Sequence, residues 1–132
     1  MSDRVTFEVS TAQAMPGSRY DLVTMFDCLH DMGDPVGAAR QIHAALAEGG
    51  TWMVVEPAAG DHVEDNLNPV GRAYYGFSTL LCTPCSLSQD VGLALGTQAG
   101  PARIRDVTMT AGFTDFRLVA QTPFNNVFAV QH

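Results

Sequence analysis

The residues best placed to do chemistry follow residues 20–26, an apolar segment with the composition of a buried parallel strand. After it come Asp27 and Cys28, and then the pair His30-Asp31. Imidazole titrates near neutral pH, so His30 is the candidate catalytic base. The helix start beyond it would lower the pKa of His30 and keep the ring neutral, whereas Asp31 would steady the ring or oppose that shift. The alternative is a histidine that only caps or packs at a strand end.

Two other predicted strand ends carry polar residues. Ser10-Thr11-Ala12 follows the alternating segment 5–9, and Glu56 closes the apolar segment 51–56. Ligands in open α/β sheets collect at the carboxyl ends of parallel strands, because loops and helix N-termini converge there. The three strand ends therefore predict one site, with the alternative that they are polar only because strand ends are polar in any protein.

The segment Cys82-Thr83-Pro84-Cys85 has the CxxC spacing of zinc and redox sites. A zinc site needs more ligands, and the sequence has no second CxxC and no HxxxH, so Cys28 or a distant histidine would have to complete it. A thioredoxin-like CxxC lies at a helix start after an early strand, which is not the position of this one. We therefore predict no metal site and interpret both cysteines as ordinary thiols.

The apolar pattern predicts the elements that position these side chains. Strands are expected at residues 5–9, 20–26 and 51–56, and a helix is expected to begin at Asp34-Pro35 and to end at Gly49-Gly50. Strand, helix and strand in this order indicate a βαβ unit, and hence a parallel sheet in an α/β fold.

The second half of the chain is interpreted as a lid followed by a terminal helix and strand pair. Residues 58–100 contain an aromatic, apolar stretch at 74–81 that is expected to be helical. A further helix is expected at 101–111, and an antiparallel pair at 116–120 and 126–130.

The composition excludes several classes of protein. The 132 residues fit one domain, and 14 acidic against 7 basic residues give a formal net charge of -7. Binding to nucleic acid or to an anionic membrane needs clustered Lys and Arg, so neither partner is expected. The sequence shows no apolar stretch of the length of a membrane span and no signal peptide, and three cysteines are too few for a disulfide framework. A cytoplasmic protein is expected.

Several motifs resemble the second half of a class I S-adenosylmethionine (SAM)-dependent methyltransferase, in a specific order and spacing. They are Tyr20-Asp21-Leu22-Val23, Leu29-His30-Asp31-Met32, Asp34-Pro35, Leu46-Ala47-Glu48-Gly49-Gly50 and Val54-Val55-Glu56-Pro57. Later motifs are similar to the C-terminal half of a bacterial, largely actinobacterial, small-molecule branch of that superfamily. These are Leu87-Ser88-Gln89, Leu95-Gly96-Thr97-Gln98-Ala99-Gly100, Ala111-Gly112-Phe113-Thr114 and Thr122-Pro123-Phe124-Asn125.

The resemblance implies a SAM cofactor and a small-molecule methyl acceptor. Ser10-Thr11-Ala12 falls where the family contacts the adenine, and Phe26-Asp27-Cys28 falls near the methionine part of the cofactor. The pair His30-Asp31 matches the His-Asp pair of related O-methyltransferases, whose histidine is the general base on an acceptor hydroxyl.

The resemblance starts at the third strand of the family's sheet. The first two strands, with the glycine-rich loop and the acidic residue that hold most of the cofactor, have no counterpart in the sequence, and neither has the winged-helix segment of some members. We therefore expect a truncated Rossmann-like methyltransferase sheet with a helical lid. Residues 1–132 are expected to form one domain, with the lid at 58–100 and with weak or absent binding of SAM.

In the family's sheet order, the strand at 20–26 would have a bare apolar edge, and such edges seek partners. We expect a homodimer, a strand-exchanged dimer, or a rearranged sheet in which segments 5–9 and 20–26 pair; equally, the chain is a piece of a longer enzyme. The functional prediction is an incomplete or fragmentary SAM-dependent methyltransferase for a small-molecule acceptor. The alternative is a non-catalytic dimeric binding or interaction module derived from one.

Overall fold

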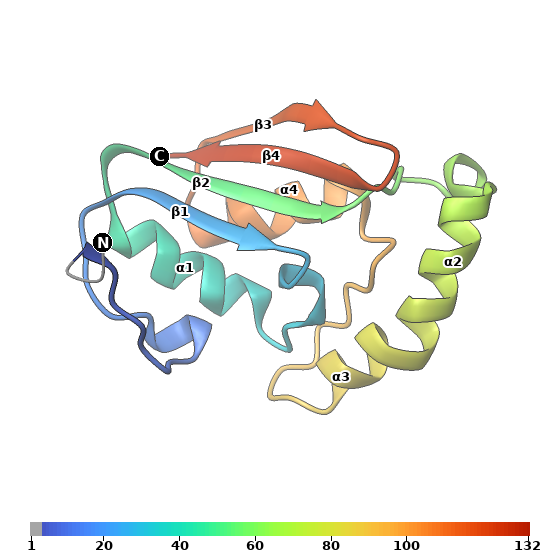
Figure 1. Ribbon diagram of the computed structural model, residues 1–132, viewed down its shortest axis with the longest axis horizontal. Helices are drawn as coiled ribbons and strands as arrows, with labels where there is room; N and C mark the ends of the chain where they lie inside the picture. Colours follow the sequence, from blue (N-terminus) through green and yellow to red (C-terminus); the bar gives the residue numbers. More distant parts are fainter. Residues whose placement is uncertain (1–3) are drawn as a thin grey trace.

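A four-stranded mixed sheet organises residues 4–132, the part of the chain that the computed structural model describes (Figure 1). The strands lie in the order β1-β2-β4-β3. Strands β1 and β2 are parallel, and β4 is antiparallel to both of its neighbours. The expected α/β sheet with an antiparallel C-terminal pair is confirmed. The bounds are β1 (Tyr20–Phe26), β2 (Leu46–Pro57), β3 (Asp115–Gln121) and β4 (Asn125–Gln131).

Helix α1 (Pro35–Ala45) connects β1 to β2 and begins where the sequence predicts. The Asp34 carboxylate accepts a hydrogen bond from the Gly37 N–H (2.8 Å), which satisfies a donor that the helix itself leaves free. The proline at the first helical position has no N–H that needs a partner. Ala39 and Ile42 on the inner side of α1 are fully buried in the core.

The pair Gly49-Gly50 lies in a strand, which corrects the prediction that it ends the helix. Helix α1 ends at Ala45, and β2 follows without a loop. Gly49 has a φ of 75°, in the left-handed region, at the point where the register of β2 against β1 shifts. A Cβ on Gly50 would lie 2.7 Å from the carbonyl oxygen of Tyr20. An irregularity early in β2 therefore requires both glycines, and the sequence pattern does not distinguish it from a helix end.

Residues 5–9 form no strand, so that prediction is wrong. The segment pairs with none of the strands in residues 4–132, and the side chains of Val5, Phe7 and Val9 are exposed. A strand persists only when its backbone N–H and C=O groups find partners. The alternating pattern of residues 5–9 finds no such partner within residues 4–132.

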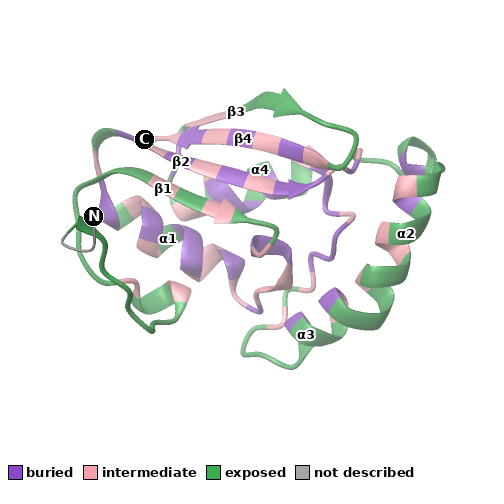
Figure 2. Cartoon of the chain, in the orientation of Figure 1, coloured by how far each residue is buried: buried purple, intermediate pink, exposed green. Residues whose placement is uncertain are grey.

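Strand β1 is an edge strand, with no neighbour on its outer side within the described residues. Tyr20, Leu22 and Phe26 on β1 are exposed, whereas β2 and β4 carry the buried residues of the sheet (Figure 2). The bare apolar edge expected from the sequence is therefore confirmed. The rearranged sheet, in which residues 5–9 pair with β1, is not observed.

The core lies between one face of the sheet and the helices α1 and α4 (Gly100–Ala111) (Figure 1). Trp52 and Val54 of β2 and Phe128 of β4 are buried on this face. Because side chains alternate along a strand, Glu56 continues the same face and is buried as well. The buried face therefore becomes polar at the carboxyl end of β2.

The segment between β2 and α4 is helical over half its length. It forms a 3-10 turn (Val63–Asn66), α2 (Pro69–Phe77), a π-helical turn (Ser78–Cys82) and α3 (Thr83–Leu87), and α2 and α3 lie beyond the carboxyl ends of β1 and β2 (Figure 1). The helical stretch predicted at residues 74–81, the helix α4 and the terminal strand pair are confirmed. Within the part of the chain that is described, no helix has the length and apolar character to cross a membrane.

Replacing Asp34 with alanine should destabilise the fold by about 1 kcal/mol, because the Gly37 N–H loses its capping acceptor. Urea denaturation followed by circular dichroism measures this. Asp106→Ala is the matched control, since Asp106 is an exposed carboxylate inside α4 and alanine favours the helix. An equal loss of stability in both variants would contradict the role of Asp34.

Candidate active site

The candidate site forms where β1 ends and the chain turns back over β2. The Asp27 N–H bonds to the Val55 carbonyl (2.8 Å), which extends the parallel pairing one residue past β1. Asp27 has a φ of 46°, and this left-handed backbone ends the strand. The 3-10 turn Leu29–Asp31 follows and brings His30 to the end of β2 that carries Glu56.

Glu56 binds this turn through both of its carboxylate oxygens. Oε1 accepts a hydrogen bond from the Leu29 N–H (2.9 Å), and Oε2 lies 2.5 Å from Nδ1 of His30. Glu56 and His30 are each only 3% exposed. Burying a carboxylate is costly unless donors satisfy it, so the two bonds stabilise the charged side chain in this position. The contact fixes the His30 ring, with Nδ1 on the carboxylate and Nε2 directed away from it.

The pKa of His30 is raised, which corrects the expectation that it is lowered. Burial has the largest effect and alone would lower this pKa, because it disfavours the imidazolium. The hydrogen bond and the charge of Glu56, with the charges of Asp31 and Asp27, outweigh burial. The expectation from the sequence rests on the helix start and Asp31, and does not include the buried carboxylate of Glu56.

The second ring nitrogen of His30 faces two other titratable groups. Nε2 lies 3.3 Å from Oδ1 of Asp31, and this oxygen is buried with no hydrogen-bond partner among residues 4–132. Sγ of Cys82 lies within 4.8 Å of ligand atoms of both residues. Burial, and after it the interaction with Asp31, raises the pKa of the Cys82 thiol to about 12. Cys82 is therefore a neutral thiol at physiological pH.

The residues predicted for the methionine part of the cofactor lie at this same strand end. Phe26 is exposed, Cys28 is half-buried, and Oδ1 of Asp27 accepts a hydrogen bond from Nδ2 of Asn125 (2.8 Å). Burial, followed by the charge of Glu56, raises the pKa of the Cys28 thiol. Phe26, Asp27 and Cys28 thus lie at the end of β1, directly before the turn that carries His30.

Ser10-Thr11-Ala12, predicted for the adenine, lies along the side of β1 instead. These residues line a hollow of about 400 Å³ together with Met25 of β1 and Ile42 of α1. His30 does not line this hollow, and the Ser10 hydroxyl donates to the Ala14 carbonyl (2.6 Å) within its own turn. The two predicted groups of cofactor residues therefore do not share one cavity.

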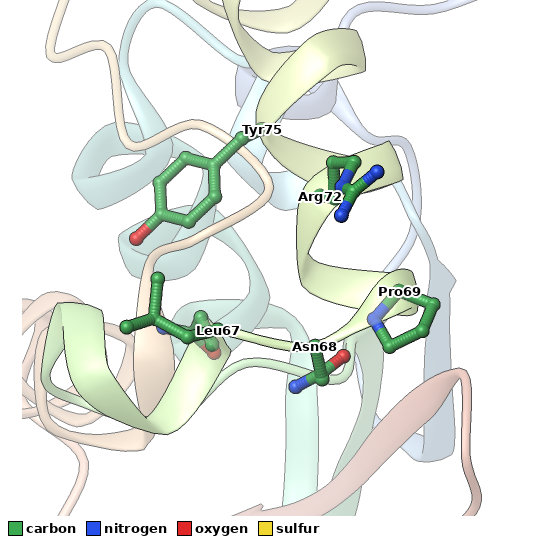
Figure 3. Close-up of a pocket in the computed structure, with 6 residues that line it drawn as sticks. Leu67, Asn68, Pro69, Arg72 and Tyr75 are labelled. Atoms are coloured by element: carbon green, nitrogen blue, oxygen red, sulfur yellow. The ribbon is translucent and has the colours of Figure 1, made fainter.

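A second hollow, of about 410 Å³, lies at the start of α2 (Figure 3). Leu67, Arg72 and Tyr75 line it, and Asn68 is occupied in capping α2, since its Oδ1 accepts from the Gly71 N–H (2.9 Å). No predicted catalytic or cofactor residue lines this hollow. It belongs to the segment predicted to be a lid and is distinct from the site around His30.

The sequence places Glu56 at a strand end without assigning it a role, and it assigns Cys82 no part in the site. A prediction of the register between the two parallel strands could have found Glu56. Phe26 pairs with Val55, so Glu56 and the residues after Phe26 lie at the same edge of the sheet. Cys82 has no comparable signal. Tertiary packing of α3 on the turn Leu29–Asp31, rather than a spacing in the sequence, brings its sulfur to His30.

Residues 2–84 match the family model of a methyltransferase domain. This match covers more than half of the sequence, and the motifs around the strand ends lie within it. The chain therefore belongs to this methyltransferase family. No curated protein matches the sequence.

Solved methyltransferase structures share the fold. An O-methyltransferase family protein from Burkholderia thailandensis is 18% identical with a TM-score of 0.68, over 98% of this chain and 36% of its own. Human N-acetylserotonin methyltransferase in complex with SAM is 19% identical with a TM-score of 0.60, over 98% and 36%. PigF with SAH is 20% identical with a TM-score of 0.64, over 92% and 33%. The chain thus has a Rossmann-like methyltransferase fold and spans about a third of the length of these proteins.

Glu56→Gln should lower the pKa of His30. An amide cannot supply the negative charge that stabilises the imidazolium, so burial becomes the dominant influence on the ring. An NMR titration of the carbon-bound ring protons of His30 measures this pKa. Glu64→Gln removes a carboxylate from the 3-10 turn Val63–Asn66 and should leave it unchanged. The same His30 pKa in the Glu56 variant and the wild type would contradict the assignment.

Proposed function

We propose that the chain provides the catalytic end of a SAM-dependent methyltransferase that acts on a small-molecule hydroxyl. The observation that carries this proposal is the buried hydrogen bond between Glu56 and His30 at the carboxyl ends of two parallel strands, with Asp31 beside it. Membership of a methyltransferase family supports the reaction class. SAM or S-adenosylhomocysteine (SAH) in two of the similar structures supports the cofactor.

In this proposal His30 accepts the proton of the acceptor hydroxyl. Glu56 holds a proton on Nδ1, so the neutral ring carries its lone pair on Nε2. When the acceptor oxygen attacks, its proton moves to Nε2, and the carboxylate of Glu56 stabilises the resulting imidazolium. Because the pKa of His30 is raised, the neutral ring becomes more abundant as the pH rises through that pKa, and the rate should rise with it. Asp31 is a positioning residue beside Nε2.

SAM, when bound, supplies the electrophilic methyl group. Phe26-Asp27-Cys28 would hold its methionine end, because these residues lie at the strand end beside His30. The side chain of Phe26 is exposed there and could contact the cofactor. Ser10-Thr11-Ala12 would contact the adenine, although these residues line a separate hollow. The chain therefore fits one end of the cofactor, and we expect it to bind SAM weakly on its own.

The proposal includes a lid formed by the segment 58–100 and a cytoplasmic location. The Ser86 hydroxyl donates to the Met32 carbonyl (2.7 Å), and Nε2 of Gln89 donates to the Asp31 carbonyl (2.9 Å). These bonds attach the end of the segment 58–100 to the turn that carries His30, which supports a lid within one domain. Three free cysteines support a reducing, cytoplasmic location.

A titration with SAH, followed by NMR of the backbone amides, tests the methyltransferase proposal. We expect saturable shifts at Phe26-Asp27-Cys28 and on the turn that carries His30, with millimolar or tighter affinity. Adenosine lacks the homocysteine part and should leave these amides unchanged. Silence at millimolar SAH would contradict the proposal.

We also propose that the chain forms a homodimer through the edge of β1. Leu22 and Phe26 are exposed there, and the outer backbone groups of β1 have no neighbouring strand in the described part of the chain. Residues 5–9 have the composition of a strand and no partner strand within residues 4–132, so in a strand-exchanged dimer they would pair with β1 of the other copy.

Light scattering on the purified chain should therefore give the mass of a dimer. Leu22→Lys places a charge on the β1 edge and should shift the chain to a monomer. Leu118→Lys makes the same change on the opposite edge strand, β3, and should leave the dimer intact. A monomeric wild-type chain would rule out this interface.

A non-catalytic dimeric binding or interaction module is the second candidate. The observation that favours it is the burial of His30, whose Nε2 faces Asp31 and Cys82 rather than an open cavity. Silence towards SAH together with a retained dimer is the outcome that supports this function.

A further inference from the structure

Three side chains from two segments of the chain meet at Nε2 of His30: His30 and Asp31 of the turn Leu29–Asp31, and Cys82 at the end of the π-helical turn Ser78–Cys82. Nε2 of His30, Oδ1 of Asp31 and Sγ of Cys82 belong to groups whose ligand atoms all lie within 4.8 Å of one another. We propose that these three residues bind a divalent cation of the zinc type. The sequence predicts no metal here, and membership of the methyltransferase family does not assign one.

The chemistry and spacing of the three groups fit zinc. Imidazole nitrogen, carboxylate oxygen and thiolate sulfur are its usual protein ligands, at about 2.0 to 2.3 Å. In a tetrahedral site these bond lengths put neighbouring ligand atoms roughly 3.3 to 3.8 Å apart. The contact of 3.3 Å between His30 and Asp31 already meets this spacing. The Cys82 sulfur, whose spacing from a nitrogen or oxygen ligand would be roughly 3.5 Å, has to approach by at most about 1.3 Å, and a water molecule fills the fourth position.

Glu56 prepares His30 as a ligand. Its carboxylate lies 2.5 Å from Nδ1, so the lone pair of Nε2 in the neutral ring is directed to the side where Asp31 and Cys82 lie. Histidine ligands of metals usually donate their other N–H to a carboxylate or carbonyl, which fixes the tautomer and makes the ligand more basic. Glu56 on Nδ1 and a cation on Nε2 would form this carboxylate–histidine–metal arrangement without any rotation of the His30 ring.

A cation would also give a ligand bond to an oxygen whose close polar neighbour is Nε2 of His30, at 3.3 Å. Oδ1 of Asp31 is buried and accepts no hydrogen bond within residues 4–132. Glu56 is buried nearby, and in the same part of the chain neither carboxylate forms a salt bridge with Lys or Arg. Unsatisfied buried oxygens of this kind are uncommon in folded proteins, and a bound ion is one way to satisfy them.

The lid segment holds Cys82 at the site. The Gly33 N–H donates to Oε1 of Gln89 (3.0 Å), and Nε2 of the same side chain donates to the Asp31 carbonyl (2.9 Å). These bonds fix the stretch after Cys82 against the turn of His30. Cys85, the second cysteine of the CxxC segment, is exposed and is not part of the cluster, so the CxxC spacing is not what defines the site.

Zinc binding has to displace the proton of the Cys82 thiol and, where His30 is an imidazolium, the proton on Nε2, so its affinity increases with pH. A cation on Nε2 also prevents that nitrogen from accepting a proton. Zinc would therefore inhibit methyl transfer, and this consequence alone rests on the proposed function.

Titration of the full, tag-free chain with Co²⁺, followed by absorption spectroscopy, tests the site without SAM or a methyl acceptor. We expect one equivalent to give tetrahedral d–d bands and a thiolate-to-cobalt charge-transfer band, and one equivalent of Zn²⁺ to remove both. Cys82→Ser should abolish the charge-transfer band. Asp31→Asn should weaken binding of Zn²⁺ about tenfold or more while keeping that band.

Two control variants make the outcome specific. Cys85→Ser removes the exposed thiol of the same segment and should bind as the wild type does. His43→Gln removes a histidine pair outside the cluster, in which Nε2 of His43 lies 3.2 Å from Nδ1 of His132, and should also bind normally. Circular dichroism checks that each variant folds. If Cys82→Ser does not fold, the weaker binding of Zn²⁺ by Asp31→Asn tests the site instead. A wild type without the charge-transfer band, or loss of the band in either control, would overturn the proposal.

Discussion

A carboxylate buried at the end of a sheet must find hydrogen-bond donors, and Glu56 finds two of them on the turn after β1. One donor is the backbone N–H of Leu29 and the other is the ring of His30. The pair of bonds connects the carboxyl ends of both parallel strands. It sets the orientation of the imidazole, raises its pKa against the effect of burial, and directs Nε2 towards Asp31 and Cys82. Both roles proposed for His30, as base and as metal ligand, depend on this contact.

Strand β1 leads into the turn of His30 at one end and forms an open edge of the sheet along its side. Its inner neighbour β2 supplies the pairing that places His30 beside Glu56. Its outer side lacks a strand within residues 4–132, and residues 5–9 are left without a partner. The contact between His30 and Glu56 is therefore formed within the chain, whereas the sheet is open on the outer side of β1 in the described residues. This difference explains why weak cofactor binding and pairing between copies are expected together.

The sequence predicts most of the fold, because the elements that bury apolar side chains have clear periodicity. Asp34 and Pro35 predict the start of α1, and the apolar run at residues 20–26 predicts β1. Residues 5–9 have an equally clear pattern and form no strand, since a strand depends on a partner that no local pattern reports. The prediction at Gly49 is wrong for a related reason: a left-handed glycine fits a helix end and an irregular strand equally well.

The site could be predicted only in part. His30 and Asp31 are adjacent in the sequence, so their pairing needs no tertiary information. Glu56 reaches His30 through the register of two strands, and Cys82 reaches it through the packing of α3. The direction of the pKa shift depends on Glu56, so it could not be obtained before the register was known.

The tautomer of the neutral His30 ring shows whether Glu56 orients the imidazole. Nitrogen-15 NMR of the histidine rings, recorded above the pKa of His30, distinguishes a proton on Nδ1 from one on Nε2. If Glu56 accepts a hydrogen bond from the ring, the neutral His30 keeps its proton on Nδ1 and leaves Nε2 unprotonated. A neutral ring with its proton on Nε2, the tautomer that free histidine favours, would show that Glu56 does not accept a hydrogen bond from Nδ1.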